Sequence, residues 1–150
     1  MPGSVWRLFK VSLGAFALAA SAATPGAEIG QLKSANGDVW IERSGARLPG
    51  TVGTRVRTAD VVKTGADGSA GMVMVDNSLL SIGPNSVLSL DRLDYDATTQ
   101  RGQFDSSLSK GSLSVVSGRI AKQSPDAMSV RTPSAILGVR GTEFVVGTDE

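Results

Sequence analysis

The sequence of 150 residues contains no cysteine and no histidine. Without cysteine it has no disulfide framework, no thiol nucleophile and no thiolate ligand for a metal ion. Without histidine it has no imidazole base, which excludes serine triads and zinc sites built on histidine. These absences remove most ways of building a catalytic or metal centre, so we predict a non-catalytic protein with no cofactor and no bound metal.

An excess of one charge is also lacking, because fifteen Lys and Arg residues are balanced by 14 Asp and Glu residues. A nucleic-acid-binding domain normally carries a basic excess. Aromatic residues make up only 5% of the chain, which argues against a surface that stacks bases. We therefore expect no nucleic-acid partner.

The first two dozen residues have the pattern of a secretory signal peptide. Arg7 and Lys10 precede an uncharged apolar run, and the small residues from Ala20 offer a cleavage site. The run is about ten residues long, whereas a bilayer-spanning helix needs roughly 20; the alternative is an uncleaved membrane anchor. We predict a signal peptide at residues 1–23, one domain at residues 24–150, a periplasmic location and no stable membrane span after cleavage.

Short apolar runs separated by Gly, Asn, Asp and Pro make up the remainder of the chain. No segment there keeps a helical period of 3.6 residues for the length that a helix needs. We predict an all-β domain of short strands, arranged as a sandwich or as a solenoid-like stack, and the regular spacing between Gly65 and Leu90 favours the solenoid. The expected strands are 38–42, 61–64, 69–75, 78–82, 86–90, 111–115 and 142–146.

Alternation of apolar and polar residues predicts which strand faces are buried. In the segment 111–115, Leu113 and Val115 should point inward and the serines outward. The segment 71–75 is apolar on both faces, which is typical of a strand covered on two sides. The polar stretch 91–109 is either an exposed loop or a hairpin carrying Phe104.

The segment from residue 130 to 146 has a pattern of its own. Pro133 fixes its φ angle and favours an extended Thr132. Gly138 and Gly141 bracket Arg140, which predicts a bulge or tight corner that aims the arginine. A closing strand should follow this corner.

Small and aromatic residues refine the picture of that segment. Ser134 and Ala135 are small enough for a neighbouring strand to approach closely. In the strand expected at 142–146, Phe144 and Val146 should share one face.

The run from Thr132 to Phe144 resembles the signature of the FecR-domain family, Thr-Pro-x-Ala-x-x-Gly-Val-Arg-Gly-Thr-x-Phe. Earlier pieces agree with the family pattern, and the resemblance covers roughly residues 29–146. Those pieces are Gly37-Asp38-Val39, Thr64-Gly65 with Gly68-Ser69-Ala70, Asp76 followed by Ser78, Gly83-Pro84-Asn85-Ser86, and Lys110-Gly111-Ser112-Leu113. The signature residues, which we predict to be structural or to contact a partner, are Thr132, Pro133, Ala135, Gly138, Val139, Arg140, Gly141, Thr142 and Phe144.

The resemblance implies a place in envelope signalling. The best-known family members are membrane regulators whose periplasmic all-β domain receives a signal from a TonB-dependent outer-membrane transporter and passes it towards a sigma factor. Only about ten residues precede the apolar run here, so we expect the sensory domain alone, exported free. We predict an interaction domain acting in envelope signalling or assembly through protein–protein contacts, with a TonB-dependent transporter or a membrane regulator as partner. The alternative is a glycan or small-ligand binding module of the cell envelope.

The sequence allows two interpretations for each of two further candidate sites. Arg140 either contacts a partner or an anionic group, or is a structural arginine held by backbone carbonyls and a carboxylate such as Glu143. Asp91, Asp94 and Asp96 form either a Ca²⁺ loop or a solvated polar edge that discourages strand pairing. No pair of carboxylates is singled out for hydrolysis, so we predict no catalytic residue.

Overall fold

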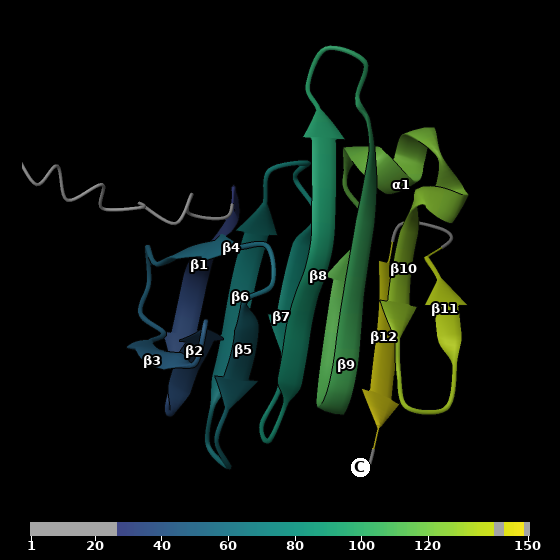
Figure 1. Cartoon of the computed structure of the whole chain (residues 1–150). Coiled ribbons are helices and arrows are strands. Elements are labelled where there is room, and N and C mark those ends of the chain that lie inside the picture. The colour runs from purple at the N-terminus through teal and green to yellow at the C-terminus, as the bar shows by residue number, and fades with distance from the viewer. Residues whose placement is uncertain (1–26, 140–142, 149–150) are drawn as a thin grey trace, which may run out of the picture.

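Two β-sheets that share one long strand account for most of the computed structural model, which describes residues 27–139 and 143–148 (Figure 1). The predicted leader, residues 1–23, lies outside this part of the chain, as do Arg140, Gly141 and Thr142. Within the described ranges, no helix is long and apolar enough to cross a membrane. The all-β fold class predicted from the sequence is confirmed.

Each sheet is an ordered row of mostly antiparallel strands. The front sheet in Figure 1 runs β3 (Ala46–Pro49), β2 (Val39–Arg43), β5 (Val61–Thr64), β8 (Val87–Asp96), β9 (Arg101–Val116), β10 (Met128–Arg131) and β11 (Ile136–Gly138). The back sheet runs β4 (Arg55–Arg57), β1 (Glu28–Asn36), β6 (Ser69–Met74), β7 (Leu79–Ile82), β9 again and β12 (Glu143–Thr148). Together the two sheets curl into a half-barrel, and β9 with β10 is the one parallel pair among the described residues.

Strand β9 joins the sheets by turning sharply at Gly111. Its first half pairs with β8 and β10, and its second half pairs with β7 and β12. Gly111 has a φ angle of 90°, and a Cβ atom there would collide with the side chain of Ser86 and lie 2.5 Å from its Cα. Only glycine adopts this conformation freely and leaves that space open, so it fixes the corner.

A single apolar core fills the space between the sheets, because alternate residues of each strand point inward. The largest fully buried side chains are Phe104, Ile29, Leu32, Ile41, Met72, Met74, Leu80, Leu88, Leu90, Leu108, Leu113 and Ile120. Phe104 therefore belongs to the β8–β9 hairpin, one of the two alternatives for 91–109, and Leu113 and Val115 point inward as predicted. One core enclosed by two sheets that share β9 is a half-barrel, so the solenoid-like stack that the spacing favoured is wrong, and the sheets are not the two separate layers of a sandwich.

One face prediction is wrong. The segment 71–75 is buried on one face only: Met72 and Met74 lie in the core, Val73 is half-buried, and Val75 is 48% exposed. The back sheet packs on the core with its inner face alone, so valines on its outer face meet solvent. Apolar residues on both faces of a strand therefore do not require two covering layers.

A short helical segment closes one end of the core, although the sequence predicted no helix there. Helix α1 (Arg119–Gln123) buries Ile120 and Ala121 and is followed by the 3₁₀ turn η1 (Pro125–Ala127). A helix of five residues is too short to produce a recognisable helical period.

Candidate interaction surface

Several early pieces of the family pattern meet at one buried corner, which we call the polar corner (Thr64, Gly83, Ser86, Gly111 and Ser112). The Thr64 hydroxyl donates to the Gly83 carbonyl at 2.6 Å and accepts the Ser86 amide at 2.9 Å. The Ser86 hydroxyl accepts the Ser112 amide at 3.0 Å. Thr64 and Ser86 are buried, so these bonds tie β5, β8 and β9 together away from water. The polar corner is a structural site.

A second buried cluster, the Asp76 cluster (Asp76, Ser78, Gly118 and Ile120), joins the β6–β7 turn to helix α1. The Asp76 carboxylate accepts the Ser78 hydroxyl at 2.8 Å, the Ser78 amide at 3.0 Å and the Ile120 amide at 3.3 Å. The Ser78 hydroxyl in turn accepts the Gly118 amide at 3.0 Å. Asp76 and Ser78 are fully buried, and this pair of family residues therefore also has a structural role.

The final signature segment begins in an exposed turn. Thr132, Pro133 and Ala135 form the tip of the β10–β11 hairpin, where the Thr132 amide donates to the Ala135 carbonyl at 2.8 Å and the Ala135 amide donates to the Thr132 hydroxyl at 3.2 Å. The expectation that Ser134 and Ala135 admit a neighbouring strand is wrong, since both lie exposed in this turn. Their small side chains suit a tight hairpin tip instead.

The remaining signature residues lie on both sides of the crossing from the front to the back sheet. Gly138 ends β11, and a Cβ atom there would meet no atom within 4 Å, so packing does not require a glycine. Val139 is buried, and its amide donates to the Met128 carbonyl at 3.0 Å. Phe144 and Val146 share the inner face of β12, as predicted. The corner around Arg140 lies outside the described residues and stays a prediction.

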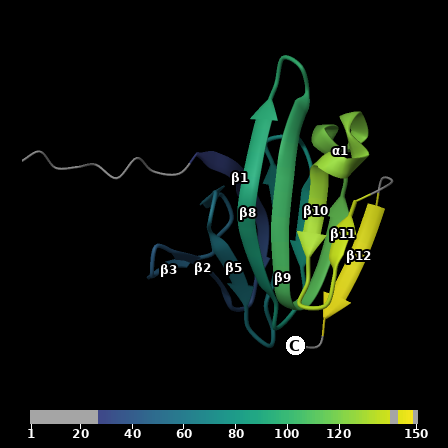
Figure 2. The same cartoon turned by 45° about the vertical axis from the view of Figure 1, so that its right-hand side comes forward.

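The exposed part of this segment forms what we call the hairpin surface (Arg131, Pro133, Ser134, Ala135 and Ile136). Ile136 is 65% exposed and gives this surface an aliphatic side chain. Arg131 makes no hydrogen bond or ion pair within the described part of the chain, so its guanidinium group can bind a partner. Figure 2 shows the β10–β11 hairpin at the side of the molecule, beside β12.

A shallow polar groove runs along the front sheet beside this hairpin. Its main part has a volume of about 310 Å³ and is lined by Asp91, Arg92, Asp105, Ser106, Ser107, Ser129 and Arg131. Asp105 accepts the Ser129 hydroxyl at 2.7 Å and the Gln103 amide group at 3.2 Å. No local sequence pattern predicts this groove, because it depends on β10 lying beside β9, where Ser129 meets Asp105, 24 residues away.

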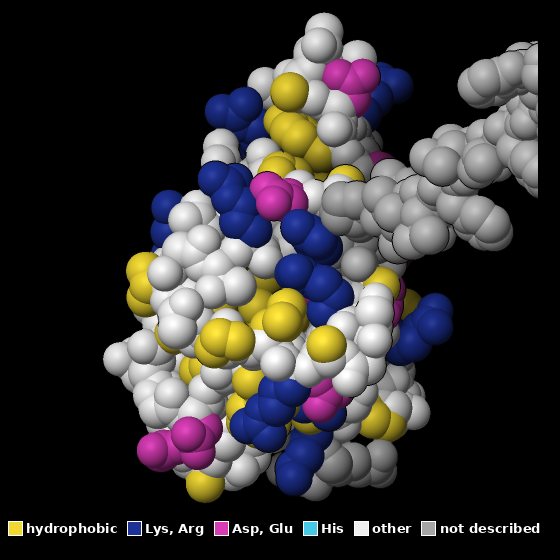
Figure 3. Space-filling model, turned by 60° about the vertical axis from the view of Figure 1, so that its left-hand side comes forward, with side chains coloured by type: hydrophobic (Ala, Val, Ile, Leu, Met, Phe, Trp, Pro, Cys, Tyr) yellow, Lys and Arg dark blue, Asp and Glu magenta, His cyan; other side chains and the backbone are white. Residues whose placement is uncertain are grey.

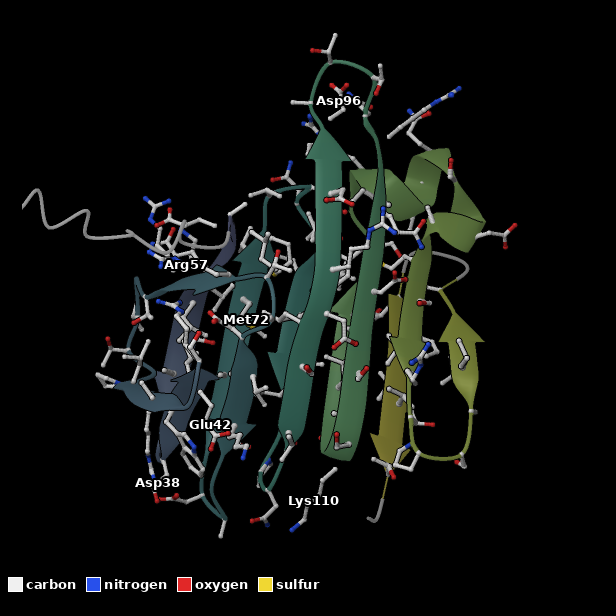
Figure 4. The ribbon with its side chains drawn as sticks, viewed as in Figure 1. Asp38, Glu42, Arg57, Met72, Asp96 and Lys110 are labelled. Atoms are coloured by element: carbon white, nitrogen blue, oxygen red, sulfur yellow. The ribbon has the colours of Figure 1, made fainter. Side chains whose placement is uncertain are left out.

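The three aspartates considered as a Ca²⁺ loop have separate partners. Asp91 accepts the hydroxyls of two serines, Asp94 pairs with Arg92 at 2.7 Å, and Asp96 accepts the Thr98 amide at 2.8 Å. Asp96 lies at the tip of the β8–β9 hairpin (Figure 4). In the ranges that the structure covers, no group of three acidic side chains could hold a metal ion.

The strongest charge pairs lie on the opposite side of the molecule from the hairpin surface. Arg43 makes two bonds to the buried carboxylate of Asp60, at 2.9 and 2.7 Å, and this hydrogen bonding raises the pKa of Arg43. Lys63 pairs with Glu42 at 2.9 Å and lowers the pKa of Glu42. Figure 3 shows this side of the molecule, with Lys and Arg side chains scattered among hydrophobic ones. These pairs join β2 to β5 and to the turn between β4 and β5.

Comparison with known proteins agrees with the signature. The family model described as FecR protein matches residues 60–150. The chain belongs to the FecR family. FecR proteins are associated with signalling regulators and TonB-dependent receptors, which connects the chain with envelope signalling. No curated protein and no solved structure matches it.

Proposed function

We propose that this FecR domain is a non-catalytic periplasmic module of envelope signalling that binds a protein partner through the hairpin surface. One observation carries the proposal. Pro133 and Ala135 of the signature are exposed at the hairpin tip, whereas Thr64, Asp76, Ser78 and Ser86 of the earlier family pieces are buried and hydrogen-bonded. A family pattern in exposed residues is accounted for by contact with another molecule.

The chemistry of the hairpin surface supports a protein partner. It combines an exposed aliphatic side chain, Ile136, with the unpaired guanidinium of Arg131. Arginine is enriched among the residues that dominate binding at protein interfaces, and an aliphatic side chain that leaves water on binding contributes apolar burial. The family association makes a TonB-dependent transporter or a membrane regulator the partner to test, and the leader predicted at residues 1–23 supports a periplasmic location.

Retention of solubilised envelope proteins by the immobilised protein tests this proposal. Replacing Ile136→Ser together with Arg131→Ala should lower retention of the transporter or regulator at least about tenfold, because both side chains contact it. Val52→Ser is the matched control, since Val52 is 64% exposed but lies between β3 and β4. Equal retention by all variants, or retention of no such protein, would contradict the proposal.

The polar groove favours a second candidate, a glycan-binding module. Its hydroxyl and carboxylate side chains can exchange hydrogen bonds with sugar hydroxyl groups. Co-sedimentation with peptidoglycan that is lost in Ser107→Ala with Ser129→Ala, and unchanged in Ile136→Ser, would support this function. Absence of co-sedimentation would exclude peptidoglycan as the ligand.

A further inference from the structure

The four strands at the ends of the two sheets differ in how well they resist pairing with another chain. Proteins protect such edges with short strands, charged side chains or proline. Strand β3 carries Arg47 and Pro49, β4 has three residues including Arg55 and Arg57, and β11 also has three residues. Strand β12 has six residues, Glu143–Thr148, and contains no proline, lysine or arginine. Its one charged residue, Glu143, stands at the first position, so β12 is the longest of the four edges and lacks protection over the residues that follow.

The surroundings of β12 leave that edge open. Along its length β12 pairs with β9, from Glu143 opposite Val116 to Thr148 opposite Gly111, and no strand pairs with its other side within the described residues. Alternate backbone amide and carbonyl groups of an edge strand point away from the sheet and can accept another strand. Val145 points outward from the half-barrel and is 70% exposed.

The sequence of β12 complements itself in one antiparallel register. A second strand that continues the sheet must keep its outward residues on the outer face, because a slip by one residue reverses every side chain. With Val145 opposite the partner's Val145, Phe144 lies opposite the partner's Val146, and Glu143 lies opposite the partner's Gly147. Apolar residues then face apolar residues, and the carboxylate faces no like charge.

A register centred on Val146 is less favourable. This register also leaves each side chain on its own face of the sheet. It sets Phe144 opposite the partner's Thr148, however, and so pairs an aromatic ring with a hydroxyl-bearing side chain. A register centred on Phe144 pairs only the first few residues of β12. The observations therefore point to one arrangement centred on Val145.

We propose that two copies of this chain associate through antiparallel pairing of β12 with β12, which continues the back sheet across the dimer. The hairpin surface belongs to the front sheet, so this contact is separate from the proposed partner site. One strand pair is a small interface, at the low end of specific contacts, and corresponds to a dissociation constant on the order of micromolar.

Disulfide crosslinking tests the register directly, because the chain contains no native cysteine. Residues directly opposite in an antiparallel pair have Cα atoms about 4.5–5.5 Å apart, within the range of about 4.4–6.8 Å that a disulfide spans. Purified Val145→Cys should therefore form a covalent dimer under mild oxidation at least about tenfold faster than Val52→Cys, a matched exposed valine. Equal rates for the two variants would overturn the proposal.

Measurement of the molar mass in solution gives a second and independent readout. The unmodified protein should change from monomer to dimer as its concentration rises to about 100 µM. Val145→Lys should remain monomeric with an unchanged urea midpoint, and Val52→Lys should still dimerise. A monomer at every concentration would exclude the dimer without affecting the test of Ile136.

Discussion

The polar corner and the hairpin surface both contain pieces of the family pattern, yet they differ in almost every physical property. In the corner, Thr64 and Ser86 are buried and their hydroxyls hold three strands together. At the hairpin surface, Pro133 and Ile136 are exposed, and Gly138 touches nothing that a side chain would displace. Residues of one family pattern therefore lie in two different environments: the corner serves folding, and the hairpin is the surface proposed for contact.

Residues of the polar corner should affect the stability of the fold, and residues of the hairpin surface should affect binding, so substitutions can test the two roles separately. Changes in the corner should lower the free energy of unfolding, whereas changes at the hairpin surface should leave it nearly constant.

Gly111→Ala should have the largest effect on stability. Its Cβ atom would strike Ser86 and force a strained positive φ angle, so we expect a loss of at least about 3 kcal/mol in the free energy of unfolding. Gly45→Ala is the control, because Gly45 also has a positive φ angle, 79°, but has no neighbour within 4 Å of the added atom. The control should lose only about 1–2 kcal/mol. Equal losses in urea denaturation would show that the corner is not tightly packed.

Asp76→Ala should have the next largest effect. It removes the acceptor for the Ser78 and Ile120 amides in a buried site, and we expect a loss of about 2–3 kcal/mol. Asp94→Ala removes an exposed ion pair with Arg92 and should lose less than about 1 kcal/mol. A small loss for Asp76→Ala in the same denaturation assay would mean that the Asp76 cluster is not a structural site.

Ile136→Ser should change the free energy of unfolding by no more than about 0.5 kcal/mol, because the side chain is already in water. The thermal midpoint, measured beside that of Gly111→Ala, checks this expectation. A loss close to that of the corner variant would remove the distinction between the two regions.

The pH dependence of Glu42→Gln should show the smallest effect. Hydrogen bonding to Lys63 lowers the pKa of Glu42, so the pair stabilises the fold above the ordinary pKa of a glutamate, about 4.3, and this contribution is lost as the pH falls through the lowered value. The variant should therefore be slightly less stable than the parent at pH 7 and equally stable near pH 2. A difference that grows on acidification would have the wrong sign.

Local sequence patterns located seven of the twelve described strands and missed β1, β3, β4, β10 and β11. Strand β5 occupies the predicted residues 61–64, and β6, β7 and β12 lie within a few residues of their predicted ends. Turn residues and the alternation of apolar and polar residues are local signals, so they indicate strands without knowledge of the tertiary fold. Exposure of Val75 was not predictable, because burial of an outer face depends on what covers the sheet.

The arrangement of the strands was not predictable from the same patterns. The parallel pairing of β10 with β9 creates the polar groove, and it joins segments that share no sequence signal. The signature residues were identified from the resemblance alone, and the exposed position of Pro133 and Ala135 became evident only from the hairpin. The pairing of strands that are distant in the sequence decides which residues meet, and a single sequence gives little information about that pairing.

Photo-crosslinking in living cells tests the central claim most directly. A photoreactive residue at position 136 samples the hairpin surface, and one at position 52 samples an equally exposed site elsewhere. The account predicts a discrete adduct with a TonB-dependent transporter or a membrane regulator from position 136 and none from position 52. The same adducts at both positions, or none at position 136, would contradict a contact role for the hairpin surface.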